Sequence, residues 1–393
     1  MRVDRLAFAR YRNLEAGELL PSPGVNIICG ENGQGKTNLL EALWLFTGAK
    51  SFRSAKDGEL IAFGRQRMEL ALDFFSRGRE QTARIVLGTG PQVKPGEKKQ
   101  SFLNDIPNPS VTAFAGVFCA VAFSPSTMGL IQNGPADRRR FLDTSICQVL
   151  PRYIEQLRAF TRALDQRNAL LKDIPRAPVL LDTLDVWDQH LARASAAVIR
   201  ARSRYCRRLS EKAAEIYAGL SGGREVFSAR YQTALEAGAA PAKEAESEAG
   251  GPAGESASAL EARLLELYRR NRRSDIEAGT TTQGPHRDEL AVSLDGVSAR
   301  SYGSQGQQRS CVLALKLAES ALLTDLNGEP PVILLDDVMS ELDNARRSYI
   351  LNHLTGKQVF ITCCDEGYFR SLEEGRIFQM KEGVLTHVSP SWE

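Results

Sequence analysis

The chain has 393 residues, of which 42% are hydrophobic and 25% are charged, so it can bury a sizeable core and is long enough for two lobes or domains. Its formal net charge is only +2, which means that a polyanionic partner must be bound by a local basic patch. The seven cysteines are scattered and include no C-x-x-C pair, which argues against a disulfide framework or a structural zinc site and favours a reducing cytoplasm.

The N-terminal segment, residues 1–29, is predicted to form strands around a turn, because apolar residues precede the turn-forming sequence Pro21-Ser22-Pro23-Gly24. The extreme N-terminus is charged where a signal peptide would be apolar. The longest unbroken apolar run, residues 117–123, is far too short to cross a bilayer. We therefore expect a cytoplasmic protein.

Residues 30–37 match the phosphate-binding pattern G-x-x-x-x-G-K-[ST], with an apolar strand before them and a helical run, Asn38–Trp44, after them. The glycines let backbone N–H groups close around a polyphosphate, while Lys36 neutralises the β and γ phosphates and Thr37 offers a hydroxyl to Mg²⁺. A glycine-rich turn that contains Gly-Lys-Thr by chance is the alternative. The flanking strand and helix favour a nucleoside triphosphate site. Its predicted binding residues are Gly30, Glu31, Asn32, Gly33, Gln34, Gly35, Lys36, Thr37 and Asn38.

Three segments beyond this helix, Met68–Phe75, Gln81–Leu87 and Lys99–Leu103, have the apolar alternation of strands and are predicted to form an antiparallel meander. A loop of this meander contains lysines that could contact a nucleic-acid backbone, although a solvated hairpin tip is the simpler explanation. These lysines are Lys94, Lys98 and Lys99.

The segment from Asp137 to about Lys212 is predicted to be helical, and it contains 16 Lys and Arg residues against nine Asp and Glu. Positive charge is therefore concentrated here. Four arginines fall within about 100° of one another on a helix and could follow a DNA backbone, or they could form an ordinary solvated face. These arginines are Arg200, Arg204, Arg207 and Arg208.

Residues 234–258 are rich in Ala, Gly, Glu, Ser and Pro and are predicted to form a flexible loop. A helix is expected from Ala259 to Arg273. Apolar residues then alternate between 290 and 294 before Asp295-Gly296, which predicts a hairpin and a return to a sheet.

The run Pro331–Asp337 is typical of a buried parallel strand that ends in two carboxylates, the place of a Walker B Mg²⁺ ligand. We assign Asp336 to Mg²⁺ through water and Asp337 to orienting the attacking water, so the predicted catalytic residues are Lys36, Asp336 and Asp337. Because Asp337 is shorter than a glutamate, we expect slow hydrolysis. Before this strand, Ser304-Gln305-Gly306-Gln307-Gln308 opens a helix whose N-terminus can also receive a phosphate.

The order of these motifs resembles an ATP-binding-cassette (ABC) head of the SMC type, and within that class the RecF family of bacterial recombination mediators. The matching segments are Arg10-Tyr11-Arg12-Asn13, Gly30–Ala42, Gly134-Pro135, Arg138–Asp143, Gly284–Asp288, Ser304–Glu319 and Leu334–Asp343. Each is weak alone, but together and in this order they are highly specific.

The fold that we predict is α/β, a two-lobe ABC-type P-loop ATPase head. Residues 1–122 and 276–393 are expected to form a discontinuous mixed-sheet lobe, and residues 123–275 a helical second lobe that contains the flexible loop. The family pattern also calls for a second-lobe glutamine contact, for which Gln132 is the candidate. His286 and Arg287 either serve the site or shape a turn.

The resemblance further implies that ATP bound by one subunit is completed by the signature of a second. Ser304 and Gly306 would then contact the γ phosphate across a dimer interface, with Asp343 close by. A site formed within one chain is the alternative that the sequence leaves open. The signature reads Ser-Gln-Gly-Gln instead of the transporter Ser-Gly-Gly-Gln. The further cofactor-binding residues implied are Arg12, Ser304, Gly306, Gln307 and Asp343.

The function implied by the resemblance is that of a weak DNA-dependent ATPase with ATP and Mg²⁺ as cofactors. It would dimerise on ATP, bind single-stranded and double-stranded DNA near their junctions, and with RecO and RecR load the RecA recombinase in replication, repair and SOS induction. Alternatives are a transporter nucleotide-binding subunit, which the helical insertion and altered signature disfavour, and an SMC-like chromosome organiser, for which the proline-broken helical segment is too short.

Overall fold

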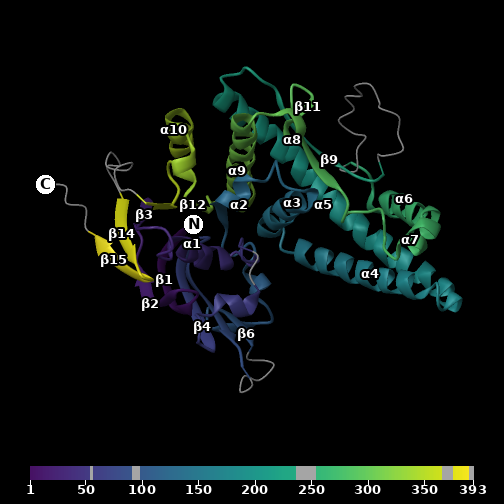
Figure 1. Cartoon of the computed structure of the whole chain (residues 1–393), viewed down its shortest axis with the longest axis horizontal. Coiled ribbons are helices and arrows are strands. Elements are labelled where there is room, and N and C mark those ends of the chain that lie inside the picture. Colours follow the sequence, from purple (N-terminus) through teal and green to yellow (C-terminus); the bar gives the residue numbers. More distant parts are fainter. Residues whose placement is uncertain (54–55, 91–97, 236–253, 365–374, 389–393) are drawn as a thin grey trace. The chain divides into compact units, whose positions relative to one another are not determined.

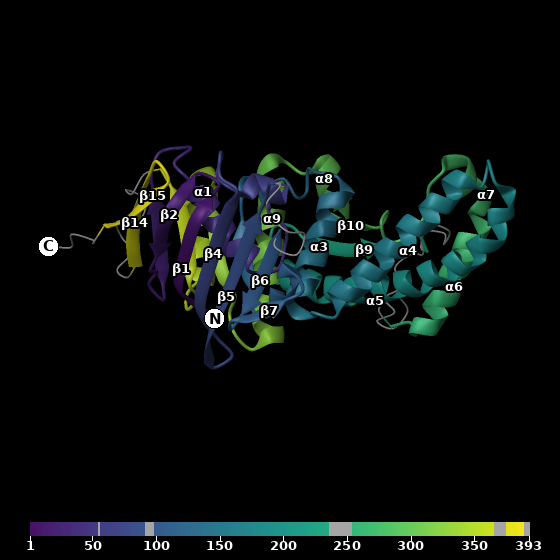
Figure 2. The same ribbon diagram turned by 90° about the horizontal axis from the view of Figure 1, so that it is seen from below.

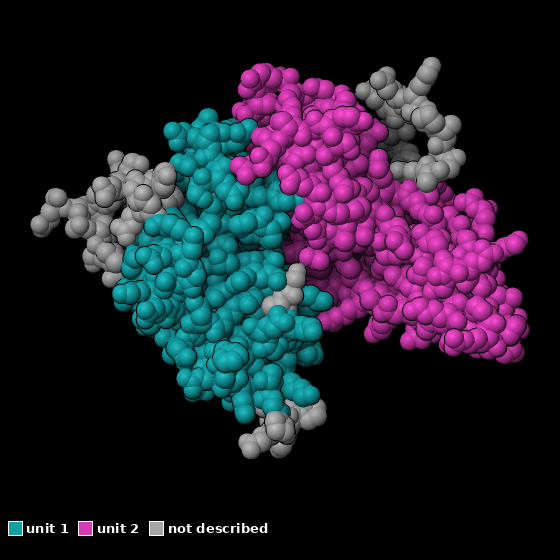
Figure 3. All heavy atoms as spheres, in the orientation of Figure 1, with its two compact units in different colours: residues 1–129, 312–393 teal, residues 130–311 magenta. Residues whose placement is uncertain are grey.

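The chain forms two compact units in the computed structural model. The residues that the structure describes are 1–53, 56–90, 98–235, 254–364 and 375–388. Unit 1 combines residues 1–129 with 312–393, and unit 2 comprises residues 130–311; Figure 3 shows them in different colours. Among the described helices, none is both long enough and apolar enough to cross a membrane.

The first sheet of unit 1 is antiparallel and has the strand order β2-β1-β4-β5-β6-β7, which can be followed in Figure 2. Its strands are β1 (Arg2–Tyr11), β2 (Leu14–Leu19), β4 (Arg67–Ser76), β5 (Arg79–Gly88), β6 (Lys99–Leu103) and β7 (Ile106–Asn108). Burial alternates along β1 and β4, as expected for strands with one face on a core. The predicted antiparallel meander is therefore confirmed.

The second sheet of unit 1 has the order β15-β14-β3-β13-β12-β8, and only its edge strand β15 runs antiparallel. The strands are β3 (Val25–Cys29), β8 (Ala120–Phe123), β12 (Val332–Asp336), β13 (Val359–Cys363), β14 (Gly375–Lys381) and β15 (Val384–Val388). Every residue of β8, β12 and β13 is buried, as is usual for parallel strands covered on both faces. This confirms the buried parallel strand predicted before Asp337.

Helix α1 (Lys36–Leu45) follows β3 and contacts strands of both sheets, β1, β12 and β13. Its Leu39, Leu40 and Leu43 are fully buried in a core cluster to which both sheets contribute. The other helical elements of unit 1 are η1 (Asp57–Leu60), η3 (Val111–Phe114), α2 (Pro125–Met128), η5 (Val338–Glu341) and α10 (Asn344–His353), while α9 (Gln305–Asn327) belongs to both units.

Unit 2 consists of long helices and a small antiparallel sheet of order β11-β10-β9. Its elements are α3 (Pro135–Val149), α4 (Tyr153–Asp173), η4 (Pro178–Leu180), α5 (Leu181–Ser221), β9 (Phe227–Gln232), α6 (Ala257–Arg270), α7 (Arg272–Ala278), β10 (Glu289–Leu294), β11 (Val297–Ser298) and α8 (Ala299–Tyr302). Helices α4 and α5 lie side by side along much of their length (Figure 1). Left-handed Asp295 and Gly296 form the predicted hairpin turn between β10 and β11.

The structure differs from the sequence predictions at three places in unit 2. Residues 276–311 belong to this unit and not to the ATPase sheets, because β10 pairs with β9. The helix expected from Ala259 to Arg273 is two helices, since the Asn271 side chain donates to the Leu267 carbonyl and ends α6. Of the loop predicted at 234–258, residues 236–253 lie outside the described residues, and α6 already begins at Ala257.

Candidate nucleotide-binding site

The loop between β3 and α1 has a backbone that requires glycine at its two ends. Gly30 has φ 152°, and a Cβ added to it would lie 2.3 Å from the Met380 carbonyl oxygen. Gly35 has φ 116°, and its added Cβ would lie 2.9 Å from Asn13 Oδ1. These positive φ angles and close approaches explain why the phosphate-binding pattern fixes glycine there.

Lys36 is the first residue of α1, and its side chain folds back over the loop. It is only 4% exposed, and its Nζ donates to the carbonyl oxygens of Gly30, at 2.5 Å, and Glu31, at 3.0 Å. The first turn of α1 contains no acidic residue. A buried ammonium and a helix N-terminus therefore provide positive charge at the same place, as an anionic ligand requires.

The carboxylate at the end of β12 lies beside the hydroxyl that follows Lys36. Thr37 Oγ1 donates to Asp336 Oδ1 at 2.9 Å, and Thr362 Oγ1, at the end of the neighbouring β13, donates to the same oxygen at 3.0 Å. Burial raises the pKa of Asp336 above its ordinary value, although these two hydrogen bonds oppose the shift. Asp337 has a left-handed backbone, and its N–H donates to Thr362 Oγ1 at 2.9 Å.

These oxygen ligands fit Mg²⁺, which binds proteins through one or two carboxylates and keeps waters or phosphate oxygens as its other ligands. Thr37 and Asp336 could hold the ion directly or through water. The described residues contain no group of three or more His, Cys, Asp or Glu side chains that could hold a metal by themselves. A cation here would therefore depend on a phosphate ligand for part of its coordination.

These groups surround a cavity of about 560 Å³ that lies wholly within unit 1. Its lining from the predicted residues is Asn32, Gly33, Gly35, Lys36, Thr37, Asn38, Asp336 and Asp337. Further lining residues that the sequence analysis did not assign to the site are Asn13, Phe52, Arg53, Ser124, Pro125 and Ser126. Arg53 donates to Asn38 Oδ1 at 2.7 Å, which places a second cation at the cavity. No motif surrounds Arg53, so only the fold could reveal it.

The remaining predicted residues of the loop and Arg12 do not line the cavity. Gln34 bonds to the turn before β15, where its Oε1 accepts from the Glu382 N–H at 2.5 Å. Arg12 forms an ion pair with Glu41, a fully buried carboxylate of α1 that also accepts from Tyr11 Oη at 2.6 Å. Arg12 thus pairs with a side chain of α1 and is not among the residues that line the cavity.

The signature residues lie at the N-terminus of α9 in unit 2. Ser304 is exposed, its N–H donates to Gln307 Oε1 at 2.7 Å, and its Oγ accepts from the Gln307 N–H at 3.3 Å, a reciprocal capping box. The Gln307 amide also donates to Glu225 at 2.5 Å. Gly306 is half-buried in the first turn. Asp343, in unit 1, is exposed, caps α10 and pairs with Arg346.

Gln132 and His286 make contacts within unit 2. The Gln132 side chain donates to Gln308 Oε1 at 2.9 Å. His286 Nε2 lies 2.8 Å from the Thr281 carbonyl inside the turn, and burial lowers the pKa of this histidine. Arg287, next to it, is exposed. In unit 2 His286 therefore shapes the turn.

The predicted DNA contacts have different settings. Arg204, Arg207 and Arg208 are exposed on α5, whereas Arg200 is half-buried. Lys98 is exposed, and Lys99 pairs with Asp57 at 2.9 Å. Lys94 lies outside the described residues. The three exposed arginines of α5 thus face solvent, as contacts with DNA phosphates require.

The family model described as RecF/RecN/SMC N terminal domain matches residues 2–386. The DNA replication and repair protein RecF of Ruminiclostridium cellulolyticum is 37% identical over 376 residues, which cover 95% of each chain. The chain belongs to the RecF family. Two solved structures of the recombination mediator protein RecF in the RecFOR pathway, one with ATPrS and one with ATP, are similar to it over nearly the whole chain.

The RecF–ATP structure has a TM-score of 0.86 and 31% identity and covers 99% of this chain and 98% of its own. The RecF–ATPrS structure has a TM-score of 0.87 and 30% identity and covers 98% of both chains. The predicted fold, an ABC-type ATPase head of the RecF and SMC class, is confirmed by this similarity. The RecF resemblance inferred from the motifs is confirmed as well.

Proposed function

We propose that this chain is an ATP-dependent DNA replication and repair protein in which bound ATP holds two copies together on DNA. One observation carries the proposal: Lys36, Thr37 and Asp336 converge on a single cavity, with Thr37 Oγ1 2.9 Å from Asp336 Oδ1. RecF structures bound to ATP, similar over nearly the full length, support the same ligand.

In this proposal Lys36 neutralises the β and γ phosphates, and Thr37 and Asp336 hold Mg²⁺, Asp336 through water. The ion would supply charge stabilisation at the transferred phosphoryl group. Asp337, which follows β12 directly, orients the attacking water. Its side chain is one methylene shorter than glutamate and reaches less far, so hydrolysis is slow and ATP acts as a timed clamp.

The dimer is proposed to form through Ser304, Gly306 and Gln307, which would contact the triphosphate of a second copy, with Asp343 close by. Support comes from the exposure of Ser304 at the N-terminus of a 23-residue helix, where N–H groups can meet an anion. We further propose that the dimer binds DNA at single-strand to double-strand junctions, acts in the cytoplasm with RecO and RecR to load RecA, and supports SOS induction.

Sedimentation of the full chain with and without ATP and gapped DNA tests the clamp. Wild type should dimerise only with ATP, whereas Ser304→Arg should bind ATP normally and stay monomeric, because the added side chain blocks the signature surface. Ser258→Arg, the same change at an exposed serine of α6, should dimerise as wild type does. A wild type that stays monomeric with ATP and DNA, or loss of ATP binding by Ser304→Arg, contradicts the split site.

The DNA surface is tested by reversing Arg204 and Arg207 to Glu. If both side chains contact phosphates, the slope of log affinity against log salt should fall by about 1 per contact, and binding should weaken on every DNA sequence. The matched control reverses Arg158 and Arg162, two exposed arginines of α4, and should leave the slope unchanged. Equal effects in the two double variants would reject a specific role for α5.

A further inference from the structure

Two buried cysteines of unit 1 face each other at the phosphate loop, and the proposed function gives them no role. Cys29 is the last residue of β3, directly before the loop, and Cys363 is the last residue of β13. The two residues are opposite each other in the register of these adjacent parallel strands. Their sulfur atoms are 3.1 Å apart, with one thiol donating to the other.

This geometry is close to that of a disulfide. Neighbouring strands lie about 4.8 Å apart, within the range of about 4.4–6.8 Å that disulfides accept between Cα atoms. A sulfur–sulfur bond is about 2.05 Å long, so the two sulfurs need to approach by only about 1 Å. Residues opposite each other in register also point to the same side of the sheet, so no side chain has to turn around.

We propose that Cys29 and Cys363 are a redox modification site, in which a hydroperoxide converts the two thiols to a disulfide. Cys363 is 8% exposed and Cys29 only 1%, so the peroxide reaches Cys363 first. With hydrogen peroxide as the oxidant, the Cys363 sulfur takes one peroxide oxygen and becomes a sulfenic acid, and the other oxygen leaves as water. The Cys29 sulfur then displaces the hydroxyl, which leaves with the Cys29 proton as a second water.

The disulfide would change the nucleotide site, a consequence that depends on the proposed function. Cys29 precedes Gly30, whose carbonyl oxygen accepts a hydrogen bond from Lys36 Nζ. Cys363 follows Thr362, whose hydroxyl bonds to Asp336. The approach of the two sulfurs by about 1 Å would therefore shift Gly30 and Thr362, which position the phosphate-binding lysine and the Mg²⁺-binding carboxylate. We expect ATP affinity to fall about tenfold and to recover on reduction. In a reducing compartment such a bond would be transient and suited to sensing.

The test treats the full chain with hydrogen peroxide, alkylates the remaining thiols, and maps the linked peptides by mass spectrometry while ATP affinity is measured in parallel. The expected product is a peptide pair joined through Cys29 and Cys363 that has lost two hydrogen atoms and that dithiothreitol separates. Absence of this pair at peroxide levels that oxidise the exposed Cys364 would overturn the proposal.

Four variants separate this site from the other thiols. Cys29→Ala and Cys363→Ala, made separately in case one folds poorly, should each keep their ATP affinity after peroxide treatment. Cys364→Ala should still form the bond and lose affinity, although its sulfur lies 3.5 Å from Lys36 Nζ. Cys206→Ala, a buried cysteine of unit 2, should respond as wild type does. If Cys364→Ala were the only variant that kept its ATP affinity after peroxide treatment, the effect would belong to Cys364, and the proposed pair would be rejected.

The two proposals fail in different ways. If the reduced chain does not bind ATP, the proposed function is wrong, while the linked peptide still decides whether the disulfide forms. If the disulfide forms and ATP affinity does not change, the modification site stands and its effect on the nucleotide site is rejected.

Discussion

Both units bury charged side chains, but unit 1 buries them beside one large apolar cluster, whereas unit 2 buries arginines that are each paired with a carboxylate. In unit 1 a single cluster joins both sheets and α1 through buried aliphatic and aromatic residues. In the described part of the chain, the nearly fully buried arginines, Arg138, Arg167 and Arg202, all belong to unit 2. Stacked sheets bury whole apolar faces, whereas long helices in contact on several sides place polar positions inside, where each must find a partner.

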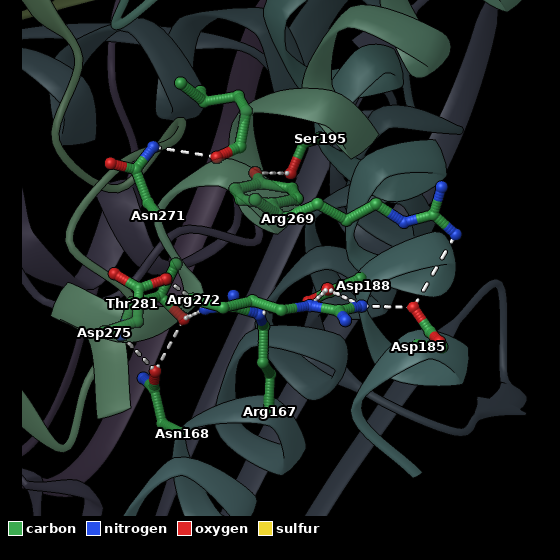
Figure 4. A network of polar contacts seen from close by, with 12 residues as sticks. Arg167, Asn168, Asp185, Asp188, Ser195, Arg269, Asn271, Arg272, Asp275 and Thr281 are labelled. Carbon is green, nitrogen blue, oxygen red and sulfur yellow. Dashed lines mark hydrogen bonds and ion pairs between the residues drawn. The ribbon is translucent and has the colours of Figure 1, made fainter. Parts of the chain in front are cut away.

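The network around Arg167 shows how unit 2 satisfies this need (Figure 4). The Arg167 guanidinium, on α4, donates to Asp188 on α5 and to Asp275 on α7, both at 2.7 Å. Arg272 pairs with Asp188 and Asp185, and Thr281 accepts from Arg167 at 2.8 Å. We infer that these directional contacts fix how the three helices align, which apolar packing alone specifies less sharply.

The strongest way to break this contrast is Arg167→Met, which keeps the volume roughly the same but leaves Asp188 and Asp275 buried without this cation. We expect a loss of about 4 kcal/mol in the free energy of unfolding of unit 2, because an uncompensated buried charge is costly. Hydrogen exchange of α4 and α5 peptides measures it. The exposed Arg162→Met, on the same helix, should change stability by less than about 0.5 kcal/mol. Equal protection in the two variants would contradict a stabilising network.

A smaller loss in the free energy of unfolding is expected in unit 1 from Leu43→Ala, which opens a cavity at a fully buried position of α1. The cost should be about 3 kcal/mol and should depend on the volume removed, not on pH or salt. Denaturant unfolding followed by hydrogen exchange in the two sheets provides the measurement. Leu326→Ala, at a 42% exposed leucine of the same unit, is the control. A loss at Leu43 that varied with ionic strength would show that the comparison of the two interiors is wrong.

The smallest effect concerns Asp336, one of the buried carboxylates of unit 1. Burial raises the pKa of Asp336, so the folded state holds the proton of this carboxyl more tightly than the unfolded state does. The stability that the protonated carboxyl contributes is therefore lost as pH rises through the folded pKa. Asp336→Asn should therefore be more stable than wild type at neutral pH, and the difference should shrink as pH falls. Denaturant midpoints at a series of pH values test this. The same variant should lose ATP hydrolysis. If Asp336→Asn were less stable than wild type at neutral pH, the expected direction of the stability difference would be wrong.

Local sequence was sufficient for the phosphate loop and the strand ending at Asp336, because the spacing of Gly30, Gly35 and Lys36 reflects backbone requirements that few other structures share. The buried, parallel character of β12 also followed, since an unbroken apolar run of that length is typical of such a strand, whereas its partners β13 and β8 came only from the structure.

Other features depended on contacts between distant residues. The β9–β10 pairing that keeps residues 276–311 in unit 2 is set by partners about 60 positions apart, which no local pattern reports. Arg53 reaches the cavity only because the fold places it beside Asn38. The buried arginines looked like ordinary members of a basic helical segment, because burial cannot be distinguished from exposure by charge counts.

Helix α5 has 41 residues and continues without a break from Asp188, in the ionic network, to Tyr217. Tyr217 donates to Glu225, which also accepts from the signature residue Gln307. The stretch from Asp188 to Tyr217 is about 44 Å long. A rigid rod of that length converts a tilt of about 3° at one end into a displacement of about 2 Å at the other. Helix α5 therefore connects the ionic network around Arg167 with the hydrogen bonds that hold Gln307 at the N-terminus of α9.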